Sequence, residues 1–207
     1  MYSEQNNDAK KISYCIGLDV AARMMHLPFD FDKDAFLDAI KTMMNGERPD
    51  ISQEDFEKQM DKFSKILQDS KKQNEKDNSD NRKEGDAFRA EYEKKEGVQK
   101  TASGLLVKVL VEGKGKAPKS SDTVKVHYEG KLINGKVFDS SYKRNEPAEF
   151  ALDTVIPGWT EGLQLAKEGG KLELVIPPEL AYGKAGAGSV IPPESTLIFT
   201  VELIEII

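Results

Sequence analysis

The sequence predicts an α+β protein: an N-terminal helical module, then a long charged helix, then an antiparallel sheet with one short helix. Three observations lead to this prediction. Up to residue 67 the apolar residues recur every three or four positions, which is the helical period. Residues 68–86 then contain no apolar residue at all. From about residue 101 apolar and polar residues alternate, as in strands with one buried face.

The N-terminal module consists of two predicted helices within residues 8–46. The second is expected to begin at an N-cap, Asp32, and to end near Gly46. About forty residues are marginal for an independent core, so the apolar surplus predicts pairing with a second chain. The alternatives are docking onto the chain's own C-terminal domain and, for the cluster of Met24, Met25, Met43 and Met44, contact with unfolded chains. The first helix carries two apolar stripes: Ile12, Ile16, Val20, Met24 and Leu27, and Tyr14, Leu18, Ala21 and Met25.

The long helix has a strong start signal, because Ser52 can cap it and Asp55 follows three residues later. The charged run at 68–86 is typical of a solvated helix or a flexible spacer. Its poor helix formers between Asn78 and Gly85 make a break there plausible. We therefore divide the chain into a helical dimerisation module (1–50), a long charged connecting helix (51–100) and a sheet domain (101–207).

The sheet domain contains several strand signals and one short helix. Alternation predicts strands at residues 105–111, 124–128 and 172–176, and a long final strand closes the chain. Asn134-Gly135 between two short apolar runs predicts a β-hairpin. Trp159, the only tryptophan, opens a short helix, and by itself it is best explained as the core residue that faces the sheet.

Composition excludes several classes of function. The net charge of −6 disfavours nucleic acid as the main partner. No stretch approaches the roughly 18 apolar residues of a membrane helix. A single cysteine excludes an intrachain disulfide, and neither histidine has a cysteine nearby, so we expect no metal and no other cofactor. Without a visible leader we expect a cytoplasmic location, or a periplasmic or exported one if a signal has been removed.

Four linked stretches go beyond these general features. They are VKVHYEGKLINGKVFDSSYKRNEP (124–147), VIPGWTEGL (155–163), IPPELAYGKAGAG (176–188) and VIPPESTLIFTVELIEI (190–206). Together they resemble the FKBP family of peptidyl-prolyl cis-trans isomerases, the receptors for the macrolides tacrolimus and rapamycin. The N-terminal helices, with YCIGLDVA at 14–21, resemble the dimeric Mip-like bacterial subgroup.

The resemblance implies an FKBP-like sheet wrapped around the short helix, with a proline-binding pocket between them. In the family pattern the Ile156 N–H and the Tyr182 phenol hydrogen-bond substrate carbonyls, and Asp139 supplies a local field. The catalytic positions would be Asp139, Tyr182 and Ile156. The substrate-binding positions would be Tyr128, Phe138, Arg144, Phe150, Val155, Trp159, Val190, Ile191 and Phe199.

The predicted function is isomerisation of X-Pro bonds in unfolded or partly folded proline-containing chains, with chaperone activity. A homodimer through the N-terminal helices and macrolide inhibitors are the other expected partners. Ala148 and Ala187 replace an aromatic residue and a histidine common in the family, which predicts a more open pocket. They also motivate the alternative, a non-catalytic FKBP-fold chaperone or binding protein.

Overall fold

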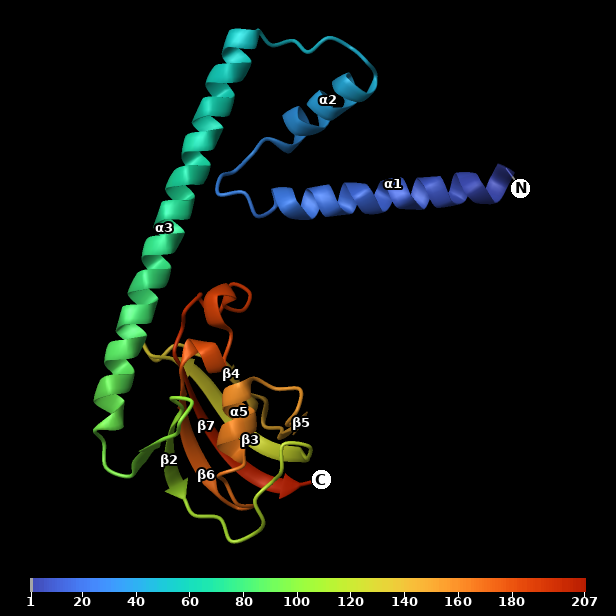
Figure 1. The fold of residues 1–207 in the computed structure, drawn as a ribbon. Coiled ribbons are helices and arrows are strands. Elements are labelled where there is room, and N and C mark those ends of the chain that lie inside the picture. The colour runs from blue at the N-terminus through green and yellow to red at the C-terminus, as the bar shows by residue number, and fades with distance from the viewer. Residues whose placement is uncertain (1) are drawn as a thin grey trace. The chain divides into compact units, whose positions relative to one another are not determined.

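The protein is described by a computed structural model that covers residues 2–207, with side chains from residue 8 onward. The chain forms two compact units, Met1–Asn74 and Glu75–Ile207. Helices α1 (Tyr2–Met24) and α2 (Lys33–Met44) belong to the first unit. Helix α3 (Gln53–Glu93) begins in the first unit and ends in the second (Figure 1).

The predicted helix starts of the first unit are confirmed. The carboxylate of Asp32 accepts hydrogen bonds from the backbone N–H groups of Asp34 and Ala35. The Asp55 N–H donates to Ser52 Oγ (3.1 Å), and Ser52 donates in turn to the Asp55 carboxylate (2.8 Å). Each cap satisfies N–H groups that lack a partner within the helix.

The apolar side chains of the first unit remain largely in water. Its aromatic contacts include Phe63 of α3 against Phe29, with ring centroids 5.7 Å apart. No residue of α2, all of which the structure describes, is buried. Many exposed apolar side chains close together in the sequence usually mark an interaction surface. The most exposed apolar side chains of α1, α2 and their connection are Ile12, Tyr14, Ile16, Leu18, Met25, Met43 and Met44.

Helix α3 is continuous over 41 residues, so the break considered between Asn78 and Gly85 does not occur. Ion pairs one turn apart support this stretch, including Lys83 with Asp80 and Arg82 with Asp86. Gly85 is buried, so the expectation that the whole run is a solvated spacer is wrong for this part. Tertiary packing here outweighs weak helix propensity.

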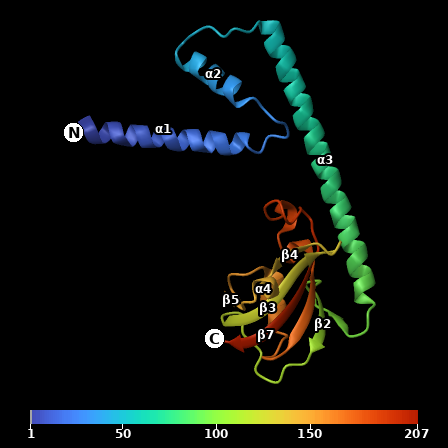
Figure 2. The same ribbon diagram turned by 180° about the vertical axis from the view of Figure 1, so that it is seen from behind.

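The second unit is built on one antiparallel sheet with the order β1-β2-β6-β7-β3-β4, while β5 also pairs with β3 (Figures 1 and 2). The hairpin at Asn134-Gly135 is confirmed, with Gly135 at φ +84°. The strands are β1 (Val98–Lys100), β2 (Leu106–Val111), β3 (Thr123–Leu132), β4 (Val137–Ser140), β5 (Ala148–Ala151), β6 (Lys171–Ile176) and β7 (Leu197–Ile206). The short helices are α4 (Ser141–Arg144), α5 (Pro157–Leu163), η1 (Pro178–Leu180) and η2 (Gly183–Ala185).

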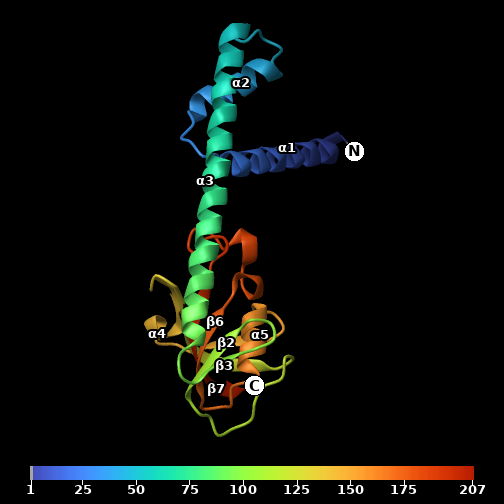
Figure 3. The same ribbon diagram turned by 60° about the vertical axis from the view of Figure 1, so that its left-hand side comes forward.

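Both faces of this sheet are covered near its centre. The main core lies between α5 and one face, and Val124, Leu163 and Leu174 are fully buried there. On the other face the end of α3 lies over β2, β6 and β7 (Figure 3). Tyr92 of α3, at 4% exposure, belongs to this second cluster.

Two glycines let α5 approach the sheet closely. A Cβ atom at Gly158 would lie 2.4 Å from Ile176 Cγ2, and one at Gly162 would lie 2.8 Å from the methyl groups of Leu174. Both neighbours are buried residues of β6. The separation of α5 from β6, and therefore the position of Trp159, depends on these two missing side chains.

We expect Gly158→Ala to destabilise the second unit by about 1–3 kcal/mol, because the added methyl overpacks the contact with Ile176. The measurement is urea unfolding followed by the fluorescence of Trp159, which reports on this unit alone. Gly17→Ala controls for the probe: it lies in the first unit with nothing within 4 Å of its added Cβ, so it should leave the Trp159 transition unchanged. Equal unfolding midpoints for Gly158→Ala and wild type would contradict the contact.

Candidate active site

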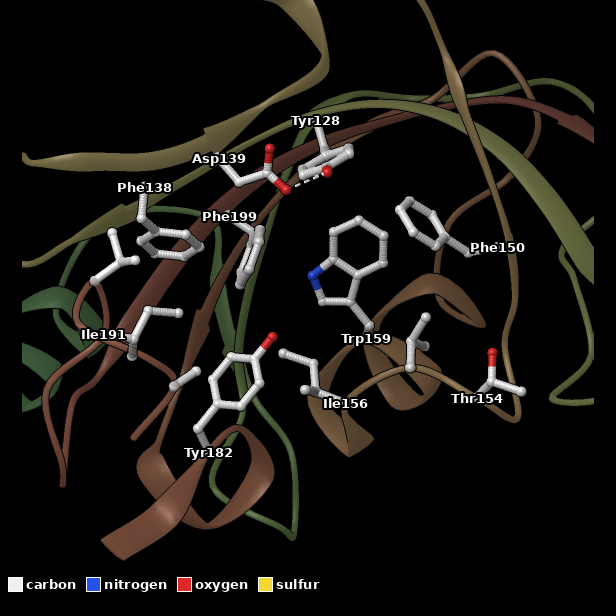
Figure 4. Close-up of a pocket in the computed structure, with 13 residues that line it drawn as sticks. Tyr128, Phe138, Asp139, Phe150, Thr154, Ile156, Trp159, Tyr182, Ile191 and Phe199 are labelled. Atoms are coloured by element: carbon white, nitrogen blue, oxygen red, sulfur yellow. Dashed lines mark hydrogen bonds between the residues drawn. The ribbon is translucent and has the colours of Figure 1, made fainter. Parts of the chain in front are cut away.

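A cavity of about 550 Å³ opens between the sheet, α5 and the segment that follows β6 (Figure 4). Its lining is apolar and aromatic, with a few polar groups at defined places, which is typical of a ligand site. Thirteen residues line it: Tyr128, Phe138, Asp139, Phe150, Thr154, Val155, Ile156, Trp159, Tyr182, Ala187, Val190, Ile191 and Phe199.

Trp159 forms the floor of the cavity and is only 4% exposed. Three rings stand edge-on to the indole, those of Tyr128 (5.2 Å between centroids), Phe150 (5.3 Å) and Phe199 (5.2 Å). Such T-shaped pairs are the preferred arrangement of aromatic quadrupoles. The indole is therefore fixed in orientation by its neighbours from β3, β5 and β7.

The indole N–H has no hydrogen-bond partner within the chain as the structure describes it. Figure 4 shows the nitrogen on the edge of the indole that faces Phe199 and Tyr182. The indole N–H thus has only aromatic rings around it, and an N–H contact with a ring is weaker than an N–H···O bond. Ring packing, and not a hydrogen bond of the indole, fixes the orientation of the Trp159 ring.

Gly130 is a contributor to the site that sequence reasoning missed. A Cβ atom there would lie 2.6 Å from ring carbons of both Phe138 and Phe199. These two rings pack edge to face, with centroids 5.5 Å apart, over the strand at that point. The available signal was a glycine directly between the predicted strand 124–128 and the apolar run before Asn134, because a glycine in or beside a strand often marks a close approach.

Asp139 lies at the rim of the cavity in a hydrogen-bonded group of three. Tyr128 donates its hydroxyl to one carboxylate oxygen, and Arg144 donates to the other. Arg144 Nη2 also donates to the Tyr128 hydroxyl at 3.0 Å, which closes the group. Arg144 does not line the cavity, and it lies behind Asp139 as a half-exposed cation.

The charge state of this group follows from these contacts. Burial raises the pKa of Asp139, but the hydrogen bonds from Tyr128 and Arg144 outweigh it, and the net pKa lies below the usual value. Burial and the bond to Asp139 raise the pKa of Tyr128. At neutral pH the rim therefore carries a fixed carboxylate and a neutral phenol, so Asp139 is a poor proton acceptor.

The three predicted catalytic positions surround the floor. We call the cavity and the side chains that line it the cup. Figure 4 shows the Tyr182 hydroxyl directed toward the centre of the cup, and Tyr182 is 41% exposed. Ile156 immediately precedes α5, and its carbonyl accepts a hydrogen bond from the backbone N–H of Trp159 at 2.9 Å. Together with Asp139 they place polar groups on opposite sides of an apolar floor.

The structure brings together all twelve predicted residues except Arg144, which reaches the cavity through Asp139. Thr154 is an additional lining residue. The two alanines behave differently. Ala187 lines the cavity, whereas Ala148 packs against the core from β5 and is not among the lining residues. Of the two alanines from which we predict a more open pocket, only Ala187 is therefore in a position to affect the cavity wall.

Both parts of the chain resemble known proteins. Residues 114–204 match the model of the FKBP-type peptidyl-prolyl cis-trans isomerases, and residues 9–109 match the domain amino-terminal to them. FkpA of Escherichia coli (strain K12) is 43% identical over 208 residues, 97% of this chain and 76% of FkpA. This chain belongs to the FKBP-type peptidyl-prolyl cis-trans isomerases.

Other FKBP-type relatives and two solved structures agree with this assignment. The 22 kDa isomerase of Escherichia coli is 57% identical over 124 residues, 60% of each chain. The crystal structure of Escherichia coli FkpA superposes with a TM-score of 0.71 at 42% identity and covers 96% of both chains. The isomerase structure from Pseudomonas syringae gives 0.59 at 41% identity, over 62% of this chain and 94% of that one. FKBP-type family membership and the FkpA-like fold are confirmed, and the chain is an isomerase.

Among residues 2–207, no helix is long and apolar enough to cross a membrane. Within the same range no cluster of three or more histidine, cysteine, aspartate or glutamate residues has the geometry to hold a metal ion.

We expect the rim group to make stability depend on acid pH. The folded-state pKa of Asp139 lies below its unfolded value of about 3.9, so its stabilisation is present above that pH and is lost as pH falls through the folded pKa. Asp139→Asn should therefore lower the free energy of unfolding at pH 7 by no more than about 1 kcal/mol, because the group is half exposed, and by less as pH falls below the unfolded value of about 3.9.

The measurement is urea unfolding of wild type and Asp139→Asn between pH 2.5 and pH 7. Asp153→Asn is the control, an exposed carboxylate of the same unit outside the group. A constant difference between wild type and Asp139→Asn across this range would contradict the assigned charge state.

Proposed function

We propose that the cup binds the proline ring of an unfolded or partly folded polypeptide and accelerates rotation about the preceding peptide bond without covalent chemistry. Amide resonance sets a barrier of about 18–20 kcal/mol for this rotation. Uncatalysed exchange takes tens to hundreds of seconds. The observation that carries the proposal is the ring-walled cavity floored by Trp159, with an ionised carboxylate fixed at its rim.

Such a site favours the twisted amide over the planar one. A planar amide is stabilised by a charge-separated resonance form, which apolar surroundings weaken. The twisted form loses that resonance and is therefore penalised less in the cup. Because about 1.36 kcal/mol of preference gives a factor of ten, a preference of about 5 kcal/mol would give close to four decades in rate.

The polar groups around the floor would hold the substrate chain while the bond turns. In the proposed mechanism the hydroxyl of Tyr182 and the backbone N–H of Ile156 bind substrate carbonyls on one side of the proline; the support is the direction of the Tyr182 hydroxyl, toward the centre of the cavity. Asp139 would act through its field on the changing amide dipole, since its low pKa argues against proton transfer. In this mechanism no metal or other cofactor takes part.

We expect Asp139→Ala to lower kcat/KM for a prolyl peptide about tenfold or more, because truncation removes the field and leaves Tyr128 and Arg144 without their acceptor. Tyr182→Phe should lower it about twofold to tenfold, the value of one hydrogen bond. The measurement is a protease-coupled prolyl isomerisation assay. Tyr142→Phe is the matched control, since its hydroxyl bonds to Glu202 and takes no part in the cavity.

The same assay separates the proposal from its rival. A wild-type protein without activity above background, but able to suppress aggregation of a denatured client, would indicate a non-catalytic FKBP-fold chaperone. Activity in wild type that survives Asp139→Ala unchanged would leave the isomerase but refute the role of Asp139.

We further propose that two copies pair through the N-terminal helices. The support is the exposed apolar surface of α1 and α2, together with the match of residues 9–109 to the domain that precedes FKBP-type isomerases. Two cups on one dimer would bind a long client with higher avidity than one, which suits a chaperone. Exposed Met25, Met43 and Met44 are adaptable contacts for unfolded chains.

We expect the wild-type protein to sediment at twice the chain mass of 23.1 kDa, and the double variant Ile12→Glu, Ile16→Glu to sediment at that mass. Both isoleucines are 60% exposed within one chain, so the charges act on association more than on folding. Lys10→Gln, Lys11→Gln is the control with the same change in net charge, −2, outside the apolar stripes. A monomeric wild type would reject the dimer and favour a module that docks on its own chain.

We also propose that the cup binds macrolide inhibitors, and we propose a cellular location for the protein. A macrolide would occupy the cup, and Ala187 offers it less contact than a larger residue would. The location is cytoplasmic or, where a leader has been removed, periplasmic or exported. Fractionation of the source cells with the mass of the native protein decides between these.

A further inference from the structure

One wall of the cup is formed by the pocket loop, which we define as residues 178–194. It carries four of the cavity-lining residues: Tyr182, Ala187, Val190 and Ile191. The Ala187 N–H donates to the Ile191 carbonyl at 2.8 Å, and the Glu194 N–H donates to the Gly183 carbonyl at 2.9 Å. The loop is thus closed on itself, and its ends determine where its lining residues stand.

Both ends of the pocket loop are held by one residue of α3. Nη1 of Arg82 contacts the carboxylate of Glu179 at one end and that of Glu194 at the other, the latter at 3.0 Å. In the preceding position Asn81 donates its amide to the Pro193 carbonyl at 3.0 Å. These contacts join residues more than ninety positions apart, and all of them lie within the second unit.

The part of α3 that bears Arg82 is itself closely fitted to the sheet domain. A Cβ atom at Gly85 would lie 2.4 Å from Thr196 Oγ1, so only glycine allows the helix to come this near. One turn later Arg89 donates to the same hydroxyl, and Thr196 is 2% exposed. Tyr92 anchors the end of the helix over β2, β6 and β7. The end of α3 that carries Arg82 is therefore held against the sheet domain, as the ribbon of α3 shows in Figure 3.

The ion pair between Arg82 and Glu194 is partly buried, unlike an ordinary surface ion pair. Glu194 is only 13% exposed, and its backbone adopts φ +57°, a conformation that costs energy for a residue with a side chain. The hydrogen bond to Glu194, followed by that to Glu179, raises the pKa of Arg82 above its ordinary value. Because both carboxylates contact the same nitrogen, removal of Arg82 would leave two negative charges facing each other, which favours opening of the loop.

We propose that Arg82 is a positioning residue of the isomerase: from α3, outside the sheet, it holds the pocket loop so that Tyr182 and Ile191 face Trp159 across the cup. The proposal rests on the proposed function of that cup and assigns a further residue to it. Loss of Arg82 reduces the fraction of molecules with a closed cup. The apparent affinity for substrate falls with that fraction, while turnover in the closed state is unchanged.

The test compares full-length wild type with Arg82→Ala, Arg82→Lys and Lys83→Ala in the prolyl isomerisation assay. Arg82→Ala should raise KM about fivefold to tenfold with kcat within a factor of two, and Arg82→Lys should lie between it and wild type. Lys83→Ala, the neighbouring cation that pairs with Asp80 on α3, should match wild type. Amide hydrogen exchange of residues 183–191 should accelerate in Arg82→Ala, because a larger fraction of molecules has the loop open.

A charge exchange guards against a merely structural effect. Arg82→Glu should be worse than Arg82→Ala, and Arg82→Glu with Glu194→Arg should recover part of the wild-type KM, because the pair is restored in reverse. The proposal is overturned if Arg82→Ala leaves KM and loop exchange unchanged, or if Lys83→Ala has the same effect. If the wild type shows no isomerisation, the proposed function fails, and the exchange rates of residues 183–191 alone decide the role of Arg82.

Discussion

The structure depends on the edge-to-face packing of three rings around the indole of Trp159. This packing needs α5 to lie close against β6, which the small residues Gly158 and Gly162 permit. It also needs Phe138 and Phe199 to meet over β3, which Gly130 permits. An apolar floor that no hydrogen bond holds is therefore located by shape, and three glycines supply the space that this shape requires.

The carboxylates around the cup follow a second rule, because each of Asp139, Glu179 and Glu194 is held by a cation that lies outside the cavity. Arg144 holds the carboxylate of Asp139 at one rim. Arg82 of α3 holds Glu179 and Glu194 at the ends of the pocket loop. The cup thus keeps an apolar interior while its walls are fixed from behind. This arrangement suits a catalyst that acts by orientation and by excluding water, with no proton to transfer.

Much of the fold could be predicted from the sequence, because it follows from local patterns. The caps at Asp32 and Ser52, the Asn134-Gly135 hairpin and the alternating strands each depend on a few adjacent residues. The lining of the cup came from the family resemblance, since the residues that meet there lie far apart along the chain. Local reasoning failed for residues 81–92 of α3. A charged run with a glycine looks solvated, and nothing nearby in sequence reveals that Gly85 packs on Thr196.

The account makes one central claim, that the walled indole floor stabilises a twisted prolyl amide. Its most direct test is the prolyl isomerisation assay on Trp159→Leu, with circular dichroism as the check that the domain remains folded. The account predicts that kcat/KM falls about a hundredfold, since the floor and the edge contacts of three rings are lost together. A folded Trp159→Leu protein with kcat/KM within a factor of two of wild type would contradict it.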